Sequence, residues 1–576
     1  MSIEQPPTAP PKRSAVELIK ENSRQLRGGL AEELATDTEK FNDQDKQLIK
    51  FHGSYQQDNR DARKDRHRQG GGKAFQFMVR CKIPGGKVTA SQYLAVDGIA
   101  EQYANGSLRI TSRQGFQFHG VMKSNLRQTI REINECLLTT LGACGDVSRN
   151  VMAPAAPLAL PAYRELQRQA DFLAQHFAPR SKAYHEIWLN GKNLQPARSA
   201  SDAVATPDLV DEPIYGKLYL PRKFKVGFAL PEDNSVDLYA QDLGFLAHVE
   251  NNAIVGYDLH AGGGMGMTHG NENTFPFIAK AICYITADQL VAAAEGVIKL
   301  FRDHGNRADR KRARLKYVLA DWGVEKFRDV LQTYVAFPLK LPKNLPVTGF
   351  PLHLGWHEQG DGKYFYGISI ENGRIKDDGD LRLRTALRTL VEKYQPSIRL
   401  TPMQDILLCD LPKSAKPLIH RLMTVYGITK PDRLSLVQTH SLACPAIPTC
   451  GLALSEAERA LPSLIDQLEV ELQRLGLEKD KISVRMTGCP NGCVRPYQSD
   501  IGIVGRSGDK YTLFVGGNLV GSRLNFVLKD LVPMDQIVAT LSPVLSNYKA
   551  NRVAAEGFGD YCQRLGESAC RALLAI

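Results

Sequence analysis

"SLRITSRQGFQFHGV", residues 107–121, is echoed 290 residues later by "SIRLTPMQDILLCDL", residues 397–411. Ser, Arg, Thr and Gln recur at matching places, and both stretches alternate apolar and polar residues as a β-strand does. Each stretch follows a predicted helix, residues 90–104 in the first copy and 383–394 in the second, and leads into another helix. The echo predicts that one α+β module occurs twice in the chain.

A second pair of stretches supports the duplication. Residues 242–264, "DLGFLAHVENNAIVGYDLHAGGG", resemble residues 500–518, "DIGIVGRSGDKYTLFVGGN". Both predict a hairpin that ends in Gly-Gly. Because the two echoes occur in the same order, we expect two related halves with pseudo-twofold symmetry. The interface between such halves is a common place for a large cofactor.

Length and composition limit the class of protein. A chain of 576 residues needs more than one core, and 43% hydrophobic with 23% charged residues is typical of a globular protein. No apolar run approaches the ~18 residues that span a bilayer. The N-terminus lacks the apolar segment of a secretory signal, and its acidic residues do not suit a transit peptide. The expected location is therefore the cytosol.

The formal net charge of +11 suits an acidic protein partner, an anionic small molecule or nucleic acid. Residues 60–73, "RDARKDRHRQGGGK", carry the densest basic run and are predicted to form a flexible arm. This run lacks the interleaved aromatic residues on which bases stack. Nucleic-acid binding is therefore the less favoured alternative.

Eleven cysteines, an odd number, argue against a disulfide framework in a cytosolic chain. Four of them form a C-x5-C pair and a C-x3-C pair, and these are Cys444, Cys450, Cys489 and Cys493. The other seven are isolated and are expected to be small apolar residues or inert thiols. They are Cys81, Cys136, Cys144, Cys283, Cys409, Cys562 and Cys570.

Four thiolates at one point need a cation to offset their repulsion. Zinc sites commonly have two to four residues between paired ligands, so C-x5-C is loose for zinc. An iron–sulfur cube is wider than one ion, and loops stiffened by Pro445, Pro448 and Pro490 can surround it, while Gly488 and Gly492 allow close backbone approach. The spacing favours a [4Fe–4S] cluster. A zinc-stapled nucleic-acid-binding protein is the alternative.

Where the second half carries cysteines, the first half carries cations, namely Arg80, Arg149, Arg222, Lys223 and Lys225. Lys223 and Lys225 stand two residues apart in a predicted strand and so face the same side. Their neighbours are apolar, which predicts partial burial and an anion as partner.

A further basic stretch, residues 307–317, reads "RADRKRARLKY". It predicts a helix whose cations, including Arg307, Arg310 and Lys311, could meet the carboxylates of a cofactor. A solvated helical face explains the same pattern nearly as well.

Six motifs carry a family resemblance: "LRITSRQGFQFHG" (108–120), "ACGDVSRNV" (143–151), "LPRKFK" (220–225), "GGGMGMTHG" (262–270), "CPAIPTCGLALSEAER" (444–459) and "TGCPNGC" (487–493). Over residues 45–565 the chain resembles the sirohaem-containing sulfite and nitrite reductase family, and within it the assimilatory sulfite reductases. The resemblance implies an α+β fold of duplicated modules, with three domains around a central sirohaem–cluster site.

The resemblance also implies a division of the chain into five parts. They are an N-terminal extension (1–70), a first ferredoxin-like half-module (71–148), a first sirohaem- and anion-binding domain (149–340), a second ferredoxin-like half-module (341–428) and a domain that binds the [4Fe–4S] cluster and sirohaem (429–576).

Roles for individual residues follow from the resemblance. The four paired cysteines would hold the [4Fe–4S] cluster, and the thiolate of Cys493 would also bridge to the sirohaem iron. The anion-binding set would be Arg80, Arg149, Lys223 and Lys225. Residues lining or near the sirohaem would be Arg113, Gln117, His119, Arg222, Asn491, Arg307, Arg310 and Lys311. His119 is predicted to pack or to form a hydrogen bond, because the family gives the axial position to the cluster thiolate.

The implied activity is the six-electron reduction of sulfite to sulfide. Nitrite reductases of the family tend to have Asn where Lys225 stands, so "KFK" favours sulfite. The chain shows no convincing nucleotide- or flavin-binding segment, so the electrons are expected to come from another protein. Several short stretches of the sequence resemble the ferredoxin-dependent branch of the family. The alternatives are a haemoprotein subunit served by an NADPH-dependent flavoprotein, and a ferredoxin–nitrite reductase.

Overall fold

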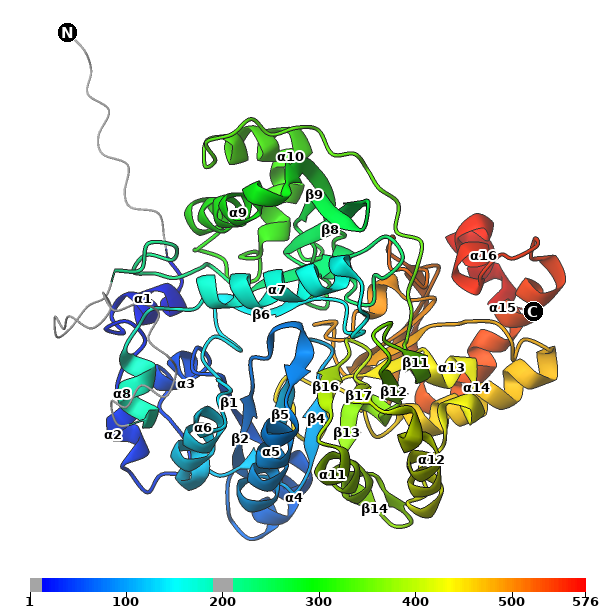
Figure 1. Cartoon of the computed structure of the whole chain (residues 1–576), viewed down its shortest axis with the longest axis horizontal. Helices are drawn as coiled ribbons and strands as arrows, with labels where there is room; N and C mark the ends of the chain where they lie inside the picture. The colour runs from blue at the N-terminus through cyan, green and yellow to red at the C-terminus, as the bar shows by residue number, and fades with distance from the viewer. Residues whose placement is uncertain (1–12, 190–210, 576) are drawn as a thin grey trace.

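The computed structural model describes residues 13–189 and 211–575. The first twelve residues of the predicted N-terminal extension therefore lie outside the described residues. Figure 1 shows two small modules side by side at the bottom, blue and yellow-green, with a green domain above them and an orange-red domain to the right. Within the described residues, no helix is long and apolar enough to cross a membrane.

The first half-module is a sheet covered by two helices, α5 (Ala90–Tyr103) and α6 (Leu126–Glu135). Its strands, in spatial order, are β1 (Ser54–Asp58), β2 (Phe75–Arg80), β5 (Phe116–Val121), β4 (Leu108–Ile110) and β13 (Arg374–Ile375). The alternating stretch 107–121 is thus a hairpin of two short strands, where the sequence predicted one strand. The Thr111 hydroxyl accepts from the Gly115 N–H at 3.2 Å and closes the turn between them.

The second half-module repeats this plan with helices α11 (Leu383–Tyr394) and α12 (Lys416–Val425). The predicted helices at 90–104 and 383–394 are therefore confirmed. Its strands, in spatial order, are β11 (Gly355–Glu358), β12 (Tyr364–Ile368), β17 (Ile406–Leu411), β16 (Ser397–Leu400) and β3 (Lys87–Val88). A small two-stranded ribbon of β14 (Asp377–Asp378) and β15 (Leu381–Arg382) precedes α11.

The two half-modules exchange their edge strands. Strand β13 of the second module pairs with β4 of the first, with Ile375 opposite Leu108. Strand β3 of the first module pairs in return with β16 of the second, with Val88 opposite Ile398. Each sheet is therefore completed by a strand from the other module, which leaves neither edge open there.

Each half-module is followed by a larger domain, and the two larger sheets have the same topology. The first runs β10 (Lys280–Thr286), β9 (Ala253–Ala261), β8 (Leu243–Glu250), β7 (Phe224–Ala229) and β6 (Ser148–Met152). The second runs β18 (Ser441–Ala443), β19 (Val484–Thr487), β20 (Ile501–Ser507), β21 (Lys510–Val515) and β22 (Phe526–Pro533). In both, the first three strands in chain order are parallel and the last two are antiparallel. The second echo thus marks equivalent hairpins, as predicted.

Helices flank these two sheets. The first domain has α7 (Pro161–His176), α9 (Leu290–His304) and α10 (Leu315–Gln332), whereas α8 (Ala183–Leu189) packs on α6 of the first half-module. The second has α13 (Leu436–Thr439), α14 (Leu461–Leu475), α15 (Ile537–Asn551), α16 (Phe558–Leu565) and α17 (Glu567–Ala572). One apolar core spans both half-modules and the first domain, and a separate core belongs to the second. The α+β fold of duplicated modules is confirmed.

The N-terminal part contributes α1 (Ala15–Glu21), α2 (Leu30–Leu34), α3 (Asp45–Leu48) and α4 (Arg60–Arg68). The prediction of a flexible basic arm at residues 60–73 is wrong, because most of that run forms α4. The Asn59 side chain accepts from the N–H groups of Asp61 and Ala62, which stabilises the start of the helix. The guanidinium of Arg60 then anchors the helix to the carbonyl of Ala453 at 2.6 Å.

The predicted basic helix at residues 307–317 is also wrong, because α10 begins only at Leu315. In the segment before α10, two side chains accept hydrogen bonds from nearby backbone N–H groups. The Asn306 side chain accepts from the Ala308 and Asp309 N–H groups, and Asp309 accepts from the Lys311 N–H. Such local bonds compete with a helix, and they send the basic side chains in different directions.

The strand exchange generates the first prediction. Replacing Ile375, which is fully buried in β13, by Ala should lower the free energy of unfolding by about 2–5 kcal/mol, because a cavity opens where the modules join. Leu381→Ala, at a residue 40% exposed in the neighbouring ribbon, is the control and should change little. Denaturant titration measures both. Equal losses would contradict a special role for the exchanged strand.

Candidate cluster and anion site

The four paired cysteines come together at one end of the second large sheet. Cys444 directly follows β18, and Cys489 follows β19 after one residue. These strands are parallel neighbours, with Ala443 opposite Met486, so the loops that follow them leave the same edge of the sheet. Cys444 and Cys489 are buried, Cys450 is half-buried and Cys493 is exposed.

The thiols lie close enough to repel one another as anions. Burial and the neighbouring Cys493 raise the pKa of Cys444 well above its usual value, and the same two causes raise the pKa of Cys489 to about 12. The pKa of Cys450 is raised by burial and by Cys493 as well. The four can be thiolates together only where a positive group sits between them, and the irons of a cluster supply such charge.

The turn from Cys489 to Cys493 depends on two glycines. A Cβ on Gly488 would lie 2.4 Å from the Ser455 carbonyl, so the backbone can approach the cysteine-bearing loop only without a side chain. Gly492 has a φ of +60°, which glycine adopts at least cost. The Gly488 N–H donates to the Cys444 sulfur at 3.4 Å, and the Asn491 amide donates to the Cys489 sulfur at the same distance. Predicted residue Asn491 therefore lies on the cysteine turn itself.

Arg80 ends β2 and is held from two sides. It pairs across the sheet with Gln117 on β5, whose amide oxygen can accept from Arg80 Nε at 3.0 Å. On the other side Arg80 Nη1 donates to the Cys144 sulfur at 3.1 Å. The sequence predicts an inert thiol at Cys144, so this contact with Arg80 was missed. The place of Cys144 near Arg149 in the motif "ACGDVSRNV" could have drawn attention to it.

Arg149 lies on β6 and Lys225 on the adjacent parallel strand β7, and Lys223 directly precedes β7. Arg149 is 9% exposed and donates to the Gly145 carbonyl and the Tyr55 hydroxyl. Lys223 and Lys225 are half-buried, as predicted. Burial, followed by Arg314 and Arg149, lowers the pKa of Lys223 to about 7, and burial followed by Arg113 lowers the pKa of Lys225 well below its usual value. Such crowding of positive charge is relieved by a bound anion.

A buried ion pair supports these lysines. Arg314 donates to both carboxylate oxygens of Asp242 at 2.8 and 2.9 Å, and the Lys225 N–H donates to Asp242 at 3.0 Å. Lys316, also buried, donates to the carbonyls of Gly264 and Gly266. Asp242 was missed as a site residue. It opens the first copy of the second echo, as Asp500 opens the other, and that repetition could have drawn attention to it.

The cysteines and the cations meet at Cys493. Its thiol interacts electrostatically with the other cysteines and, on the other side, favours the charged form of Lys223. The Ser112 hydroxyl, in the β4–β5 turn, donates to the Cys493 carbonyl at 3.3 Å. Next to it, Arg113 donates to Gln241 at 2.7 Å, and burial followed by Arg149 lowers the pKa of Arg113 to about 9.

Two buried arginine nitrogens test whether the site fits a large anionic group. Nε of Arg113 and Nη2 of Arg495 are both buried without a hydrogen-bond partner within the described part of the chain. A buried guanidinium nitrogen rarely stays unpaired, so both fit a ligand that carries acceptors, such as the carboxylates of sirohaem.

Three of the four remaining predicted cations near the sirohaem pair with acids of the chain. Arg310 donates to Asp146 at 2.7 Å, and Arg222 lies 4.0 Å from the same carboxylate. Arg307 pairs with Glu17 of α1, and Lys311 is exposed. Their predicted contacts with a cofactor remain predictions.

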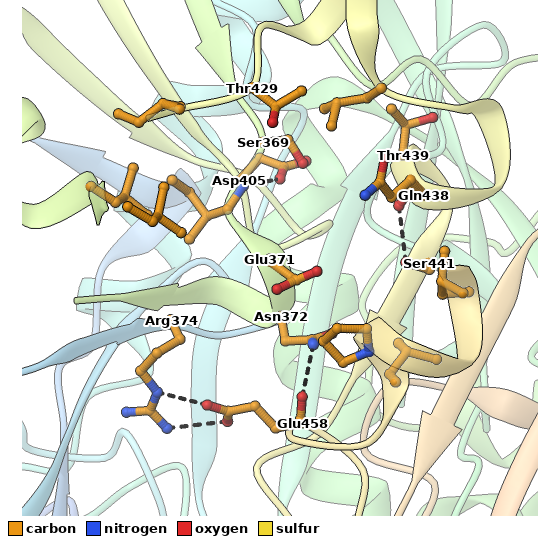
Figure 2. Close-up of a pocket in the computed structure, with 18 of the residues that line it drawn as sticks. Ser369, Glu371, Asn372, Arg374, Asp405, Thr429, Gln438, Thr439, Ser441 and Glu458 are labelled. Atoms are coloured by element: carbon orange, nitrogen blue, oxygen red, sulfur yellow. Dashed lines mark hydrogen bonds and ion pairs between the residues drawn. The ribbon is translucent and has the colours of Figure 1, made fainter. Parts of the chain in front are cut away.

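His119 takes part in a hydrogen-bond network. Its Nδ1 lies 3.1 Å from Arg374, and Arg374 and Arg109 both bind the Glu458 carboxylate. Figure 2 shows the Arg374–Glu458 pair at the lower end of a cavity of about 510 Å³ between the second half-module and the second domain. Neither the four cysteines nor the predicted anion-binding cations line this cavity. Burial lowers the pKa of His119 well below its usual value, which suits a neutral hydrogen-bonding ring.

The fold, the four grouped cysteines and the neighbouring cations suit a class of redox protein in which a thiolate-bound cluster would adjoin an anion-binding pocket. Comparison with known proteins agrees. The nitrite and sulphite reductase 4Fe-4S domain matches residues 169–339 and 440–575, and the nitrite/sulfite reductase ferredoxin-like half domain matches residues 67–136 and 357–424.

Individual relatives match nearly the whole chain. The "Sulfite reductase [NADPH] hemoprotein beta-component" of Staphylococcus saprophyticus is 42% identical over 558 residues, 96% of each chain. The "Sulfite reductase [ferredoxin]" of Synechococcus elongatus is 40% identical over 575 residues, 98% of this chain and 92% of the relative. The structure of the Mycobacterium tuberculosis NirA protein shares the fold, with a TM-score of 0.77 at 24% identity over 97% and 98% of the two chains.

The chain therefore belongs to the nitrite and sulfite reductase family. This membership confirms the predicted cofactors, sirohaem and a [4Fe–4S] cluster. The predicted domain limits at residues 70, 148, 340 and 428, and the role of each site residue, remain predictions.

The position of Cys493 generates the second prediction. Cys493→Ser should lose sirohaem and cluster iron together, because one thiol at the junction is expected to serve both groups. Cys562→Ser, at a buried cysteine of α16 outside the site, should keep both. Iron and sirohaem per chain are measured after purification. Normal amounts of both cofactors in Cys493→Ser would refute the shared position.

Proposed function

We propose that the chain is an assimilatory sulfite reductase that reduces sulfite to sulfide with electrons from a separate, acidic protein, with ferredoxin as the favoured donor. The observation that carries the proposal is the junction at Cys493, where a four-cysteine site and a crowded cationic pocket share one exposed thiol. Relatives named sulfite reductases match nearly the whole chain, which supports sulfite as the substrate.

Sirohaem coupled to a [4Fe–4S] cluster would supply single electrons to a bound oxyanion. The chain's own task is to bind the anion and deliver protons. Arg80 and Arg149 present guanidinium groups held in place by Gln117, Cys144 and Gly145, and such fixed donors bind oxyanion oxygens without reorganising.

The two lysines suit proton delivery. Because its pKa lies near 7, Lys223 can hold a proton and release it near neutral pH, as a general acid must. The pKa of Lys225, which is fixed through its backbone by Asp242, is also lowered by burial, and a bound anion would favour its charged form. Each oxygen that leaves sulfite as water takes up protons, and two adjacent lysines can provide them in turn.

Lys225 generates the third prediction. Lys225→Asn keeps a polar donor but removes one charge and one acid, so sulfite reduction should fall more than nitrite reduction. A lost charge-assisted hydrogen bond is worth about 1.5–3 kcal/mol, or roughly ten- to hundredfold in binding. Steady-state kinetics with a chemical reductant gives kcat/KM for both anions. Lys326→Asn, at an exposed lysine of α10 outside the predicted site, is the control. An unchanged sulfite-to-nitrite ratio in Lys225→Asn would contradict the pocket.

Helix α4 supports an acidic donor. It lies directly on the cysteine loop, because the Arg60 guanidinium donates to the carbonyls of Cys450 and Ala453 at 3.2 and 2.6 Å. Arg66 and Arg68 of the same helix are exposed at their side chains by 38% and 80%. A basic surface next to the cluster ligands would attract an acidic redox protein to the place where electrons must enter.

The relatives include both donor types, which keeps an NADPH-dependent flavoprotein as the second candidate. The fourth prediction separates them. Replacing Arg66 and Arg68 together by Glu should raise the KM for reduced ferredoxin at least severalfold at low salt, while turnover with a chemical reductant stays unchanged. Arg168→Glu, at a 65% exposed arginine of α7, should have no effect.

Ionic strength gives an independent check. Turnover with ferredoxin should fall as salt rises, since exposed charges are screened beyond ~8 Å at physiological ionic strength. Turnover that occurs only with an NADPH-oxidising flavoprotein would select the second candidate.

A further inference from the structure

A fully buried carboxylate, Asp237, joins the two halves of the chain. It lies between β7 and β8 with left-handed backbone angles, φ 50° and ψ 64°. Its carboxylate accepts from Arg485 at 3.0 and 3.2 Å and from Gln498 at 2.7 Å, and it forms an ion pair with Arg495. All three partners come from the second large domain.

Both arginines border the cysteine turn. Arg485 lies on β19, four residues before Cys489, and Arg495 follows Cys493 by two residues. Their exposed fractions are only 1% and 4%. Arg495 also donates to the Ser112 carbonyl at 3.2 Å, and the Ser112 hydroxyl donates to the Cys493 carbonyl. One carboxylate of the first half therefore holds both ends of the turn that carries the shared thiol.

The same backbone turn reaches the first half's own cations. The Gln241 amide donates to the Asp237 carbonyl at 3.2 Å, and its oxygen accepts from Arg113 at 2.7 Å. A continuous chain of contacts therefore runs from Arg113, a predicted sirohaem neighbour, through Gln241 and Asp237 to Arg495 on the cysteine turn.

We propose that Asp237 is a positioning residue that sets the Cys493 thiol against the first half, and so determines how closely the cluster and the sirohaem are joined. The inference rests on the proposed function. Asp237 balances one of two buried guanidinium charges, and an anionic group bound at the cysteine turn, two residues before Arg495, can offset the surplus charge. Without Asp237, both arginines would be buried without an acid, and the turn between them would lose its anchor.

The test is Asp237→Asn, which keeps the size of the side chain and removes its charge. We expect sirohaem retained after gel filtration to fall by about tenfold, as when a group that orients a ligand is removed. Any residual sirohaem should lack the electron paramagnetic resonance signature of coupling to the cluster. Far-UV circular dichroism should remain that of the parent chain.

Asp233→Asn is the matched control. Asp233 is equally buried and lies four residues earlier, but it bonds Tyr163 and His353 instead. It should keep sirohaem and coupling. Arg495→Lys, which retains the charge but cannot span both Asp237 and Ser112, should reproduce the loss if Asp237→Asn does not fold.

Full sirohaem with unchanged coupling in Asp237→Asn would overturn the inference, and so would an equal loss in Asp233→Asn, which would indicate a general loss of stability. A parent chain that contains neither cofactor would instead contradict the proposed function. The two failures are therefore distinguishable.

Discussion

The exchange of strands β3 and β13 is the constraint on which the rest of the structure depends. Each strand completes the sheet of the other half-module, so neither sheet has a full set of hydrogen bonds without its counterpart. The two half-modules therefore form one unit. Because a large domain follows each half-module in the chain, this unit also fixes where the two large domains lie. The β4–β5 turn of the first module thereby lies against the cysteine turn of the second domain.

Opposite charges explain why cations of the first half and thiols of the second half lie together where these two turns meet. The first half contributes cations whose pKa values are lowered by burial and by one another, and the second contributes thiols whose pKa values are raised for the same reasons. Like charges repel within each group, and each group supplies the opposite charge that stabilises the other. The buried carboxylates of Asp237 and Asp242 bind arginines near the boundary between the two groups, and Cys493 lies where the groups meet. The duplicated fold thus produces a site of two unlike halves.

Much of this could be predicted from the sequence, because local patterns encode it. The helix at 383–394, the paired hairpins and the partial burial of Lys223 and Lys225 follow from periodicity and neighbours. The errors at residues 60–73 and 307–317 arose where side-chain caps and distant ion pairs decide the backbone. The strand exchange and the contacts of Cys144 with Arg80 and of Asp242 with Arg314 could not be predicted, since the partners lie far apart in sequence. The motif at 143–151 and the second echo mark the two residues but not their partners.

The most direct test of the account is the cofactor content of the purified chain. An absorption spectrum, combined with iron, sirohaem and zinc analysis, reports whether the cysteine site and the cationic pocket are filled as a pair. We expect a coloured protein with one sirohaem and a four-iron cluster per chain. A colourless protein that contains stoichiometric zinc and no iron would contradict it.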